Sequence, residues 1–269
     1  MPIASEIYYH GFEGGDAESP PVVLIHGAGG NHLYWPVELR RLPGYRVYAI
    51  DLPGHGKSGG CGQQSISAYA HSVMEWLTSL RMNSAVFAGH SMGSAIALEL
   101  ALNYPDQVLG LALVGSGARL RVNPDILTDC ASPTTFHNAV DTIIANNFST
   151  HTGPRLIELA HTRMLETRQS VLHGDLLACE GFDVTERVGS IDQPTLIICG
   201  TEDKMTPLRY SQFLASAIPS AHLEVITQAG HMVMLEKPQE VAERLASFLS
   251  RITGQPGAAA VGYPLPGVK

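Results

Sequence analysis

The sequence predicts an α/β protein built on one mostly parallel sheet with helices on both faces. Short, nearly continuous apolar runs alternate with segments of helical periodicity along most of the 269 residues. Apolar runs without alternation are typical of parallel strands that are covered on both faces. Because parallel strands need crossover connections, the helical segments between them indicate right-handed βαβ units.

The pattern places six strands and four helices. The strands are expected at 22–27, 45–50, 84–89, 109–115, 195–200 and 222–226, and residues 7–14 are expected to add one or two antiparallel edge strands. The helices are expected at 65–80, 92–104, 207–218 and 238–252. The last two begin at Pro207 and Pro238, and proline favours the first helical turn because its missing N–H would have no partner there.

Residues 118–190 interrupt this alternation. They contain no convincing strand, but segments such as SPTTFHNAVDTIIANNF have helical spacing and good helix start signals. Because the strand pattern resumes near Pro194, we expect a helical lid rather than a second domain. It is inserted between the strands at 109–115 and 195–200, which are strands 6 and 7 when two edge strands are counted. The expected organisation is a core at 1–117 and 191–253, the lid at 118–190, and a tail rich in glycine and proline at 254–269.

Charge and composition exclude several classes of partner. The chain has 17 Lys and Arg against 25 Asp and Glu, a net charge of −8, whereas nucleic acid and anionic membranes are bound by basic patches. We find no signal-peptide pattern and no apolar run of the ~18 residues that span a membrane. The four cysteines are scattered and form no C-x-x-C pair, so reduced thiols and a cytoplasmic location are expected.

The segment Gly89-His90-Ser91-Met92-Gly93 carries the strongest chemical signal. It matches G-x-S-x-G, in which the serine lies on a sharp turn between a strand and a helix with its hydroxyl exposed. The flanking glycines remove Cβ atoms that would collide as the helix closes on the strand. A serine hydroxyl also needs a base, a group that orients the base, and donors for the oxyanion.

The base and the acid are expected after the last two strands of the sheet. His231 lies in QAGHMVMLEKP, and Asp203 lies in CGTEDKMTP with Glu202 as its rival. Ligands bind at the carboxyl ends of strands in open α/β sheets, and the order Ser, Asp, His is that of this elbow type. Asp51 also follows a strand, but it precedes Ser91 in the chain, whereas the acid of this elbow type follows the serine.

Other polar residues near the motifs have structural interpretations. His26 and His90 are expected to hold loops in place, and His55 lies in the turn-rich loop DLPGHGKS. The glycines of HGAGG (26–30) allow a backbone N–H to point into the site, and the second oxyanion donor is expected to be the N–H of Met92 at the start of a helix. HGAGG lacks the lysine and the spacing of phosphate-binding loops, so nucleotide binding is disfavoured.

Five motifs in register, HGAGG (26–30), DLPGHGKS (51–58), GHSMG (89–93), GTEDKMTP (200–207) and GHMVMLEKP (230–238), resemble the α/β-hydrolase superfamily. More narrowly, they are similar to its small, lidded bacterial serine esterases and lactonases, which include the carboxylesterase of biotin synthesis, enol-lactone hydrolases and meta-cleavage product hydrolases. The resemblance implies the α/β-hydrolase fold and assigns the other oxyanion N–H to Ala28. Dehalogenases and epoxide hydrolases of this fold carry aspartate where this chain has Ser91, so their reactions are disfavoured.

The resemblance implies a serine hydrolase that cleaves a small, largely apolar ester, thioester or lactone through an acyl-enzyme. Ser91 would attack the carbonyl, His231 would shuttle the proton and Asp203 would hold the imidazole, with no metal or organic cofactor. The alternatives are a ligand-sensing protein on the same fold, an acyltransferase and a C–C hydrolase. The expected partner is a small-molecule substrate.

The substrate pocket is the least determined part of the prediction. Candidates for its lining are Trp35, Met205 and Met232, but Trp35 could instead anchor its own helix. The methionines, with Met92 and Met234, could instead be ordinary core packing. Candidates to meet an acidic substrate, or to form a solvated face, are Arg119, Arg121, Arg155 and Arg163.

Overall fold

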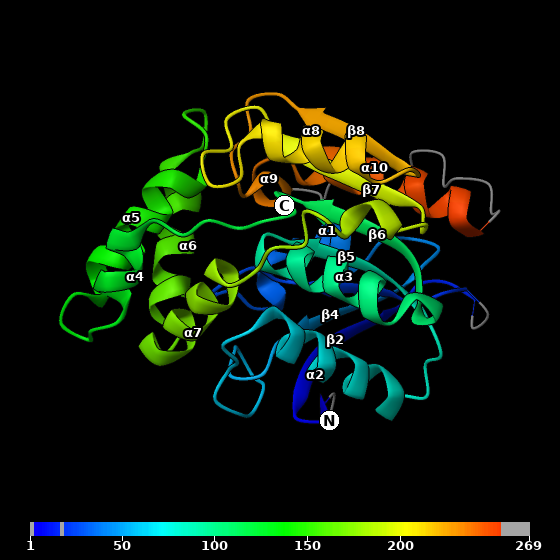
Figure 1. The fold of residues 1–269 in the computed structure, drawn as a ribbon, viewed down its shortest axis with the longest axis horizontal. Coiled ribbons are helices and arrows are strands. Elements are labelled where there is room, and N and C mark those ends of the chain that lie inside the picture. The colour runs from blue at the N-terminus through cyan, green and yellow to red at the C-terminus, as the bar shows by residue number, and fades with distance from the viewer. Residues whose placement is uncertain (1–2, 17–18, 254–269) are drawn as a thin grey trace, which may run out of the picture.

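The computed structural model describes residues 3–16 and 19–253, and these form one eight-stranded sheet of order β1-β2-β4-β3-β5-β6-β7-β8 (Figure 1). The strands are β1 (Ile3–Ala4), β2 (Ile7–Glu13), β3 (Val22–Ile25), β4 (Arg46–Asp51), β5 (Ala85–His90), β6 (Val108–Val114), β7 (Thr195–Gly200) and β8 (Ala221–Ile226). From β4 to β8 all neighbours are parallel, whereas β1 and β2 are antiparallel additions at one edge. The mostly parallel sheet and its antiparallel edge are therefore confirmed.

Helices cover both faces of the sheet. Those of the core are α1 (Val37–Arg40), α2 (Ile66–Ser79), α3 (Met92–Asn103), α8 (Leu208–Ala217), α9 (Val233–Glu236) and α10 (Pro238–Thr253), with 3-10 turns η1 (His32–Tyr34), η2 (Pro105–Gln107) and η3 (Val188–Ser190). Residues of α2, α3 and α8 pack on one face, and residues of α1 and α10 pack on the other. The four helices expected in the core are present, with ends that differ by at most one residue.

Strand β3 shows why its sequence has no polar alternation. Val23 and Ile25 belong to the core that includes α2 and α3, whereas Val22 and Leu24 belong to the core that includes α1 and α10. Successive side chains of a strand point to opposite faces, so a strand with two covered faces is apolar throughout. The carboxyl end of β3 then leads directly into the HGAGG segment.

Four described helices lie between β6 and β7 and gather at one end of the sheet (Figure 1). They are α4 (Pro124–Cys130), α5 (Phe136–Asn147), α6 (Pro154–Leu165) and α7 (Gln169–Glu180). They contact the loops at the carboxyl ends of the strands, since Asp175 of α7 accepts from the N–H of Gly29 and Glu202 accepts from the N–H of Thr150. The segment predicted to be a tail, 254–269, lies outside the described residues.

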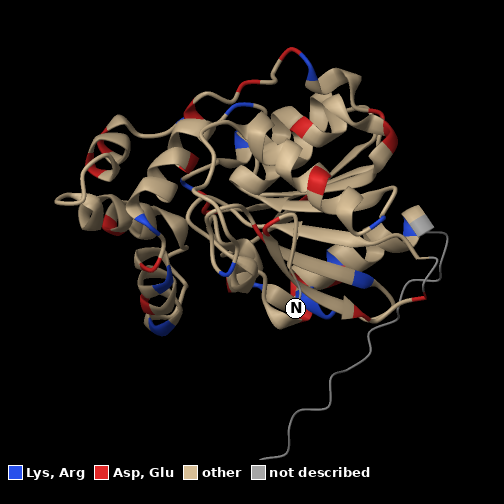
Figure 2. Ribbon diagram, turned by 90° about the horizontal axis from the view of Figure 1, so that it is seen from below, with Lys and Arg blue, Asp and Glu red and all other residues tan. Residues whose placement is uncertain are grey.

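The charged residues of the chain are interspersed. Acidic and basic positions are intermixed, mainly on helices and loops (Figure 2). Within residues 3–16 and 19–253, no helix combines the length and the hydropathy that a membrane crossing requires.

Candidate active site

Ser91 lies between β5 and α3 with a backbone conformation that non-glycine residues rarely adopt. Its φ is 53° and its ψ is −116°, and such strain costs on the order of 1–3 kcal/mol. The flanking positions must be glycine because other backbone atoms lie too close to leave room for a Cβ. A Cβ at Gly89 would lie 2.1 Å from the carbonyl oxygen of Gly93, and a Cβ at Gly93 would lie 2.2 Å from that of Ile25. The tight packing of β3, β5 and α3 therefore holds the Ser91 turn.

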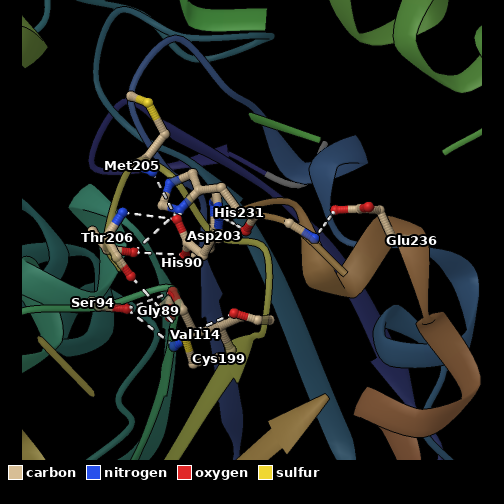
Figure 3. A network of polar contacts seen from close by, with 12 residues as sticks. Gly89, His90, Ser94, Val114, Cys199, Asp203, Met205, Thr206, His231 and Glu236 are labelled. Atoms are coloured by element: carbon tan, nitrogen blue, oxygen red, sulfur yellow. Dashed lines mark hydrogen bonds and ion pairs between the residues drawn. The ribbon is translucent and has the colours of Figure 1, made fainter. Parts of the chain in front are cut away.

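Asp203 and His231 form a buried pair at the ends of β7 and β8 (Figure 3). Oδ2 of Asp203 lies 2.9 Å from Nδ1 of His231. The hydroxyl of Thr206 donates to the same Oδ2 over 2.8 Å, and Oδ1 accepts the N–H groups of Met205 and Thr206 at 2.9 and 2.8 Å. The loop GTEDKMTP thus wraps its own backbone around the Asp203 carboxylate.

The Asp203 carboxylate is ionised in this environment. Burial raises its pKa, but the charge and hydrogen bond of His231, together with the Thr206 donors, outweigh burial and leave the pKa below its ordinary value. Since a carboxylate only accepts hydrogen bonds, Nδ1 of His231 is assigned the proton. In the neutral imidazole with this tautomer, Nε2 is the acceptor that a general base requires.

Glu202, the sequence neighbour and rival of Asp203, points to the helices between β6 and β7. Its carboxylate accepts from the N–H and the hydroxyl of Thr150 at 2.9 and 3.0 Å and lies 3.3 Å from Nε2 of His151. It has no contact with His231 among the described residues. The geometry therefore favours Asp203 as the acid.

Ser91 and His231 line the same cavity of about 260 Å³. The Ser91 N–H donates to the carbonyl of Val114 over 2.9 Å. A Cβ at the next residue, Gly115, would lie 3.1 Å from ring atoms of His231, so both residues pack on the same end of β6. The Ser91 hydroxyl makes no hydrogen bond to any described residue, and such contacts often tighten only when substrate is bound.

The backbone before Ala28 is held by two hydrogen bonds to the Gly27 carbonyl. The carbonyl of Gly27 accepts from the Gly30 N–H at 3.1 Å and from Nδ1 of His26 at 2.8 Å. In a trans peptide the N–H points opposite to the carbonyl, so the Ala28 N–H points away from both donors. Ala28 lines the cavity, and its N–H has no partner within the described part of the chain. Met92 begins α3, where an N–H has no acceptor inside the helix.

His26 and His90 hold loops, as the sequence indicated. Nε2 of His26 accepts the N–H of Leu52, so Nδ1 carries the proton that is donated to the Gly27 carbonyl. Nε2 of His90 donates to the carbonyl of His231 over 3.0 Å. Burial lowers the pKa of His26 to about 4 and that of His90 to about 3, helped by neighbouring histidines. Both rings are therefore neutral near pH 7.

The cavity includes two of the three predicted pocket residues. Met205 and Met232 line it, whereas Trp35 is fully buried in the core and is absent from the lining. The prediction for Trp35 was therefore wrong. Its neighbour Tyr34 faces the cavity instead, because η1 directs adjacent side chains to different sides. The Tyr34 hydroxyl is buried and has no partner among the described residues.

Further lining residues were not recognised from the sequence. Apolar ones come from the helices between β6 and β7, and Asn123, Asn146 and Asn147 add amides. Of the four arginine candidates only Arg121 lines the cavity, where Lys204 is a second cation. Met92 and Met234 pack in the core. In the described ranges no cluster of three or more His, Cys, Asp or Glu side chains could hold a metal ion.

Comparison with known proteins places this arrangement in a family. A family model for the alpha/beta hydrolase fold matches residues 20–238. The chain is 27% identical over 249 residues to a pimeloyl-(acyl-carrier protein) methyl ester esterase of Vibrio vulnificus (strain YJ016), covering 87% of this chain and 96% of that protein. It is also 27% identical over 247 residues to a putative carbamate hydrolase RutD of Agrobacterium fabrum (strain C58 / ATCC 33970), covering 87% and 94%.

A solved structure agrees with these relatives. A thermophilic esterase matches with a TM-score of 0.79 and 36% sequence identity, over 91% of this chain and 94% of the other. The family model spans most of the described core and the connecting helices. The chain therefore belongs to the alpha/beta hydrolase fold family.

Proposed function

We propose that the protein is a serine esterase that cleaves a small, largely apolar carboxylic ester, thioester or lactone. The observation that carries the proposal is the buried pair of Asp203 and His231, of which His231 lines one cavity with the strained Ser91. Nucleophile, base and orienting acid in this relation are the parts that acyl transfer needs.

The reaction follows from these positions. The Ser91 oxygen attacks the carbonyl carbon while Nε2 of His231 takes the hydroxyl proton, and the Asp203 carboxylate stabilises the imidazolium. The Ala28 and Met92 N–H groups donate to the oxyanion. When the tetrahedral intermediate collapses, the proton passes to the leaving alkoxide or thiolate. Water, deprotonated by His231, then attacks the acyl carbon and releases the carboxylic acid and Ser91.

The cavity supports a small substrate with an apolar acyl group. Its walls include Leu120, Ile143, Met164, Leu172 and Leu176, and its volume is about 260 Å³. Apolar walls with a few polar groups are typical of small-molecule sites. The relatives named as a methyl ester esterase and a thermophilic esterase support ester chemistry.

We assign α4–α7 the role of a lid, because they supply Ile126, Ile143, Met164, Leu172 and Leu176 to the apolar wall and lie over the ends of the strands. On this proposal residues 118–190 form the lid, and 1–117 and 191–253 form the catalytic core.

The test is a hydrolysis screen of the full chain against p-nitrophenyl esters of graded acyl length, thioesters, lactones and a carbamate. Preference for short acyl esters, thioesters or lactones is expected, with loss of activity in Ser91→Ala. The matched control is Ser67→Ala, an exposed serine on α2. Unreduced turnover by Ser91→Ala, or exclusive cleavage of the carbamate, would contradict the proposal.

A further inference from the structure

A second buried carboxylate, Asp175 of α7, lies outside the predicted triad. Its side chain is 0% exposed and contacts three donors from distant parts of the chain. Oδ2 accepts the N–H of Gly29 and Nε2 of His55, each at 2.8 Å, and Oδ1 accepts the hydroxyl of Tyr69 at 2.5 Å. One lid residue thus joins the HGAGG segment, the DLPGHGKS loop and α2.

The hydrogen bonds determine the charges of this cluster. Asp175 accepts from the Gly29 N–H and the Tyr69 hydroxyl, as a carboxylate does. His55 lies between two acceptors, Asp175 and the carbonyl of Pro53 at 3.1 Å, so both of its nitrogens carry protons. Burial lowers the pKa of His55, but the charge and hydrogen bond of Asp175 outweigh it and leave the pKa raised. Asp175 and His55 are therefore a buried ion pair.

The lid holds Gly29 from two sides. Asp175 binds its N–H, and the hydroxyl of Thr167, in the turn between α6 and α7, donates to its carbonyl over 2.8 Å. Gly29 has a φ of 65°, in the left-handed region that favours glycine. The turn is completed by the Gly30 N–H, which donates to the Gly27 carbonyl. Ala28 lies inside this turn, so the lid contacts fix the peptide on its C-terminal side.

We propose that Asp175, assisted by Thr167, is a positioning residue that aims the Ala28 N–H into the cavity. The lid is then part of the oxyanion hole as well as a cover over the substrate. This inference rests on the proposed esterase function. It gives α7 a second role, positioning the loop at Ala28, which is separate from its lining of the acyl pocket.

The expected kinetic effect is specific. Oxyanion donors stabilise the transition state more than the bound ester, and they do so only when they are held in place beforehand. A loosened Ala28 N–H therefore lowers kcat and leaves KM little changed. A lid residue that served only to shape the pocket would change KM instead.

The test compares lid variants of the full chain. Asp175→Asn keeps the side-chain size but offers an NH₂ group to donors, and Thr167→Val removes only the hydroxyl. The matched control is Thr162→Val on the exposed side of α6, where the hydroxyl bonds only the Glu158 carbonyl. Since loss of a whole oxyanion donor costs about 10²–10³-fold, we expect kcat to fall about 10–100-fold in Asp175→Asn and about 3–10-fold in Thr167→Val. The control should match the wild type.

Two readouts separate this inference from the esterase proposal. Folded Asp175→Asn with unchanged kcat, or with the loss confined to KM, would overturn the positioning role. If Asp175→Asn does not fold, Thr167→Val decides by the same criteria. If the wild type hydrolyses no ester, the esterase proposal fails by itself. Amide hydrogen exchange of residues 26–33 then decides whether the lid holds the loop: faster exchange in Thr167→Val than in Thr162→Val is expected, and equal exchange would contradict it.

Discussion

The imidazole of His90 donates a hydrogen bond of 3.0 Å to the carbonyl of His231, and the two rings lie 4.7 Å apart. His90 is the neighbour of Ser91 in the elbow, so this bond ties the loop of the proposed base to the turn of the proposed nucleophile. The partners come from β5 and from the loop after β8. The relative position of Ser91 and His231 therefore depends on a residue that has no part in the proposed proton transfer.

Replacing this donor should loosen the site. His90→Phe keeps an aromatic ring but leaves the buried His231 carbonyl unpaired, which costs about 1–3 kcal/mol. We expect the free energy of unfolding in urea to fall by about that amount, with a lower kcat. His71→Phe, at an exposed position on α2, serves as control. Equal stability of His90→Phe and the wild type would contradict the role of the bond.

The buried neutral histidines predict how stability depends on pH. Burial lowers the pKa of His90 to about 3 and of His26 to about 4, whereas the unfolded value is about 6.5. Below that value the unfolded chain binds protons that the native state excludes, so stability is present above pH 6.5 and is lost as the pH falls. Each histidine contributes about 1.4 kcal/mol per pH unit.

Urea unfolding between pH 6 and 4.5 measures this slope. At pH 5, His26 and His90 together should account for roughly 3 kcal/mol per pH unit, and His90→Phe should remove about half of it. His55, whose pKa is raised, is protonated in both the native and the unfolded state in this pH range, so it does not contribute to the slope. A wild-type stability that stays flat from pH 6 to 4.5 would be inconsistent with neutral, buried rings.

The choice between the two adjacent acids can be tested directly. Asp203→Asn removes the carboxylate that orients His231, and in well-studied serine triads such a change lowers kcat by about 10⁴-fold. We expect a loss of at least 10²-fold in ester hydrolysis. Glu202→Gln, the matched control, should keep most of the activity because Glu202 contacts Thr150 instead. The reverse ranking of the two variants would make Glu202 the acid.

Tyr34 is expected to contribute to selectivity rather than to stability. Its hydroxyl is buried at the cavity without a partner in the described residues, so Tyr34→Phe should leave the free energy of unfolding unchanged or raise it by about 1 kcal/mol. KM should rise for esters whose acyl group carries an oxygen that accepts from Tyr34, and should stay constant for simple alkanoyl esters. Tyr9→Phe, away from the cavity, is the control. An equal change of KM for both ester types would contradict a polar contact.

Most of the sheet was predictable because its signals are local. The apolar runs of β3 to β8 and the caps and prolines of α2, α8 and α10 mark those elements within a few residues of their ends. Short elements were not predicted, among them α1, α4 and α9, since four to seven residues carry too little periodicity. The start of α4 at Asn123-Pro124 does have a cap signal, because the Asn123 side chain accepts from the N–H of Asp125.

The site was predictable only as far as motifs reach. Asp203 and His231 follow strands, so topology alone brings them to one edge of the sheet. Tyr34 and Trp35 show the limit, since the backbone of η1 decides which of the two neighbours faces the cavity. Asp175 shows a different limit. It contacts Gly29, His55 and Tyr69 across 106 to 146 positions of sequence, and no local pattern encodes that meeting.

The central claim is that Ser91 forms the acyl-enzyme, and acyl trapping tests it most directly. The full chain is mixed with excess p-nitrophenyl acetate, quenched in acid within one turnover and mapped by peptide mass spectrometry. A serine-directed fluorophosphonate gives a stable adduct for comparison. The account predicts one acetyl group on the peptide that contains Ser91 and none in Ser91→Ala. An acetyl group on a different residue, carried equally by Ser91→Ala, would contradict it.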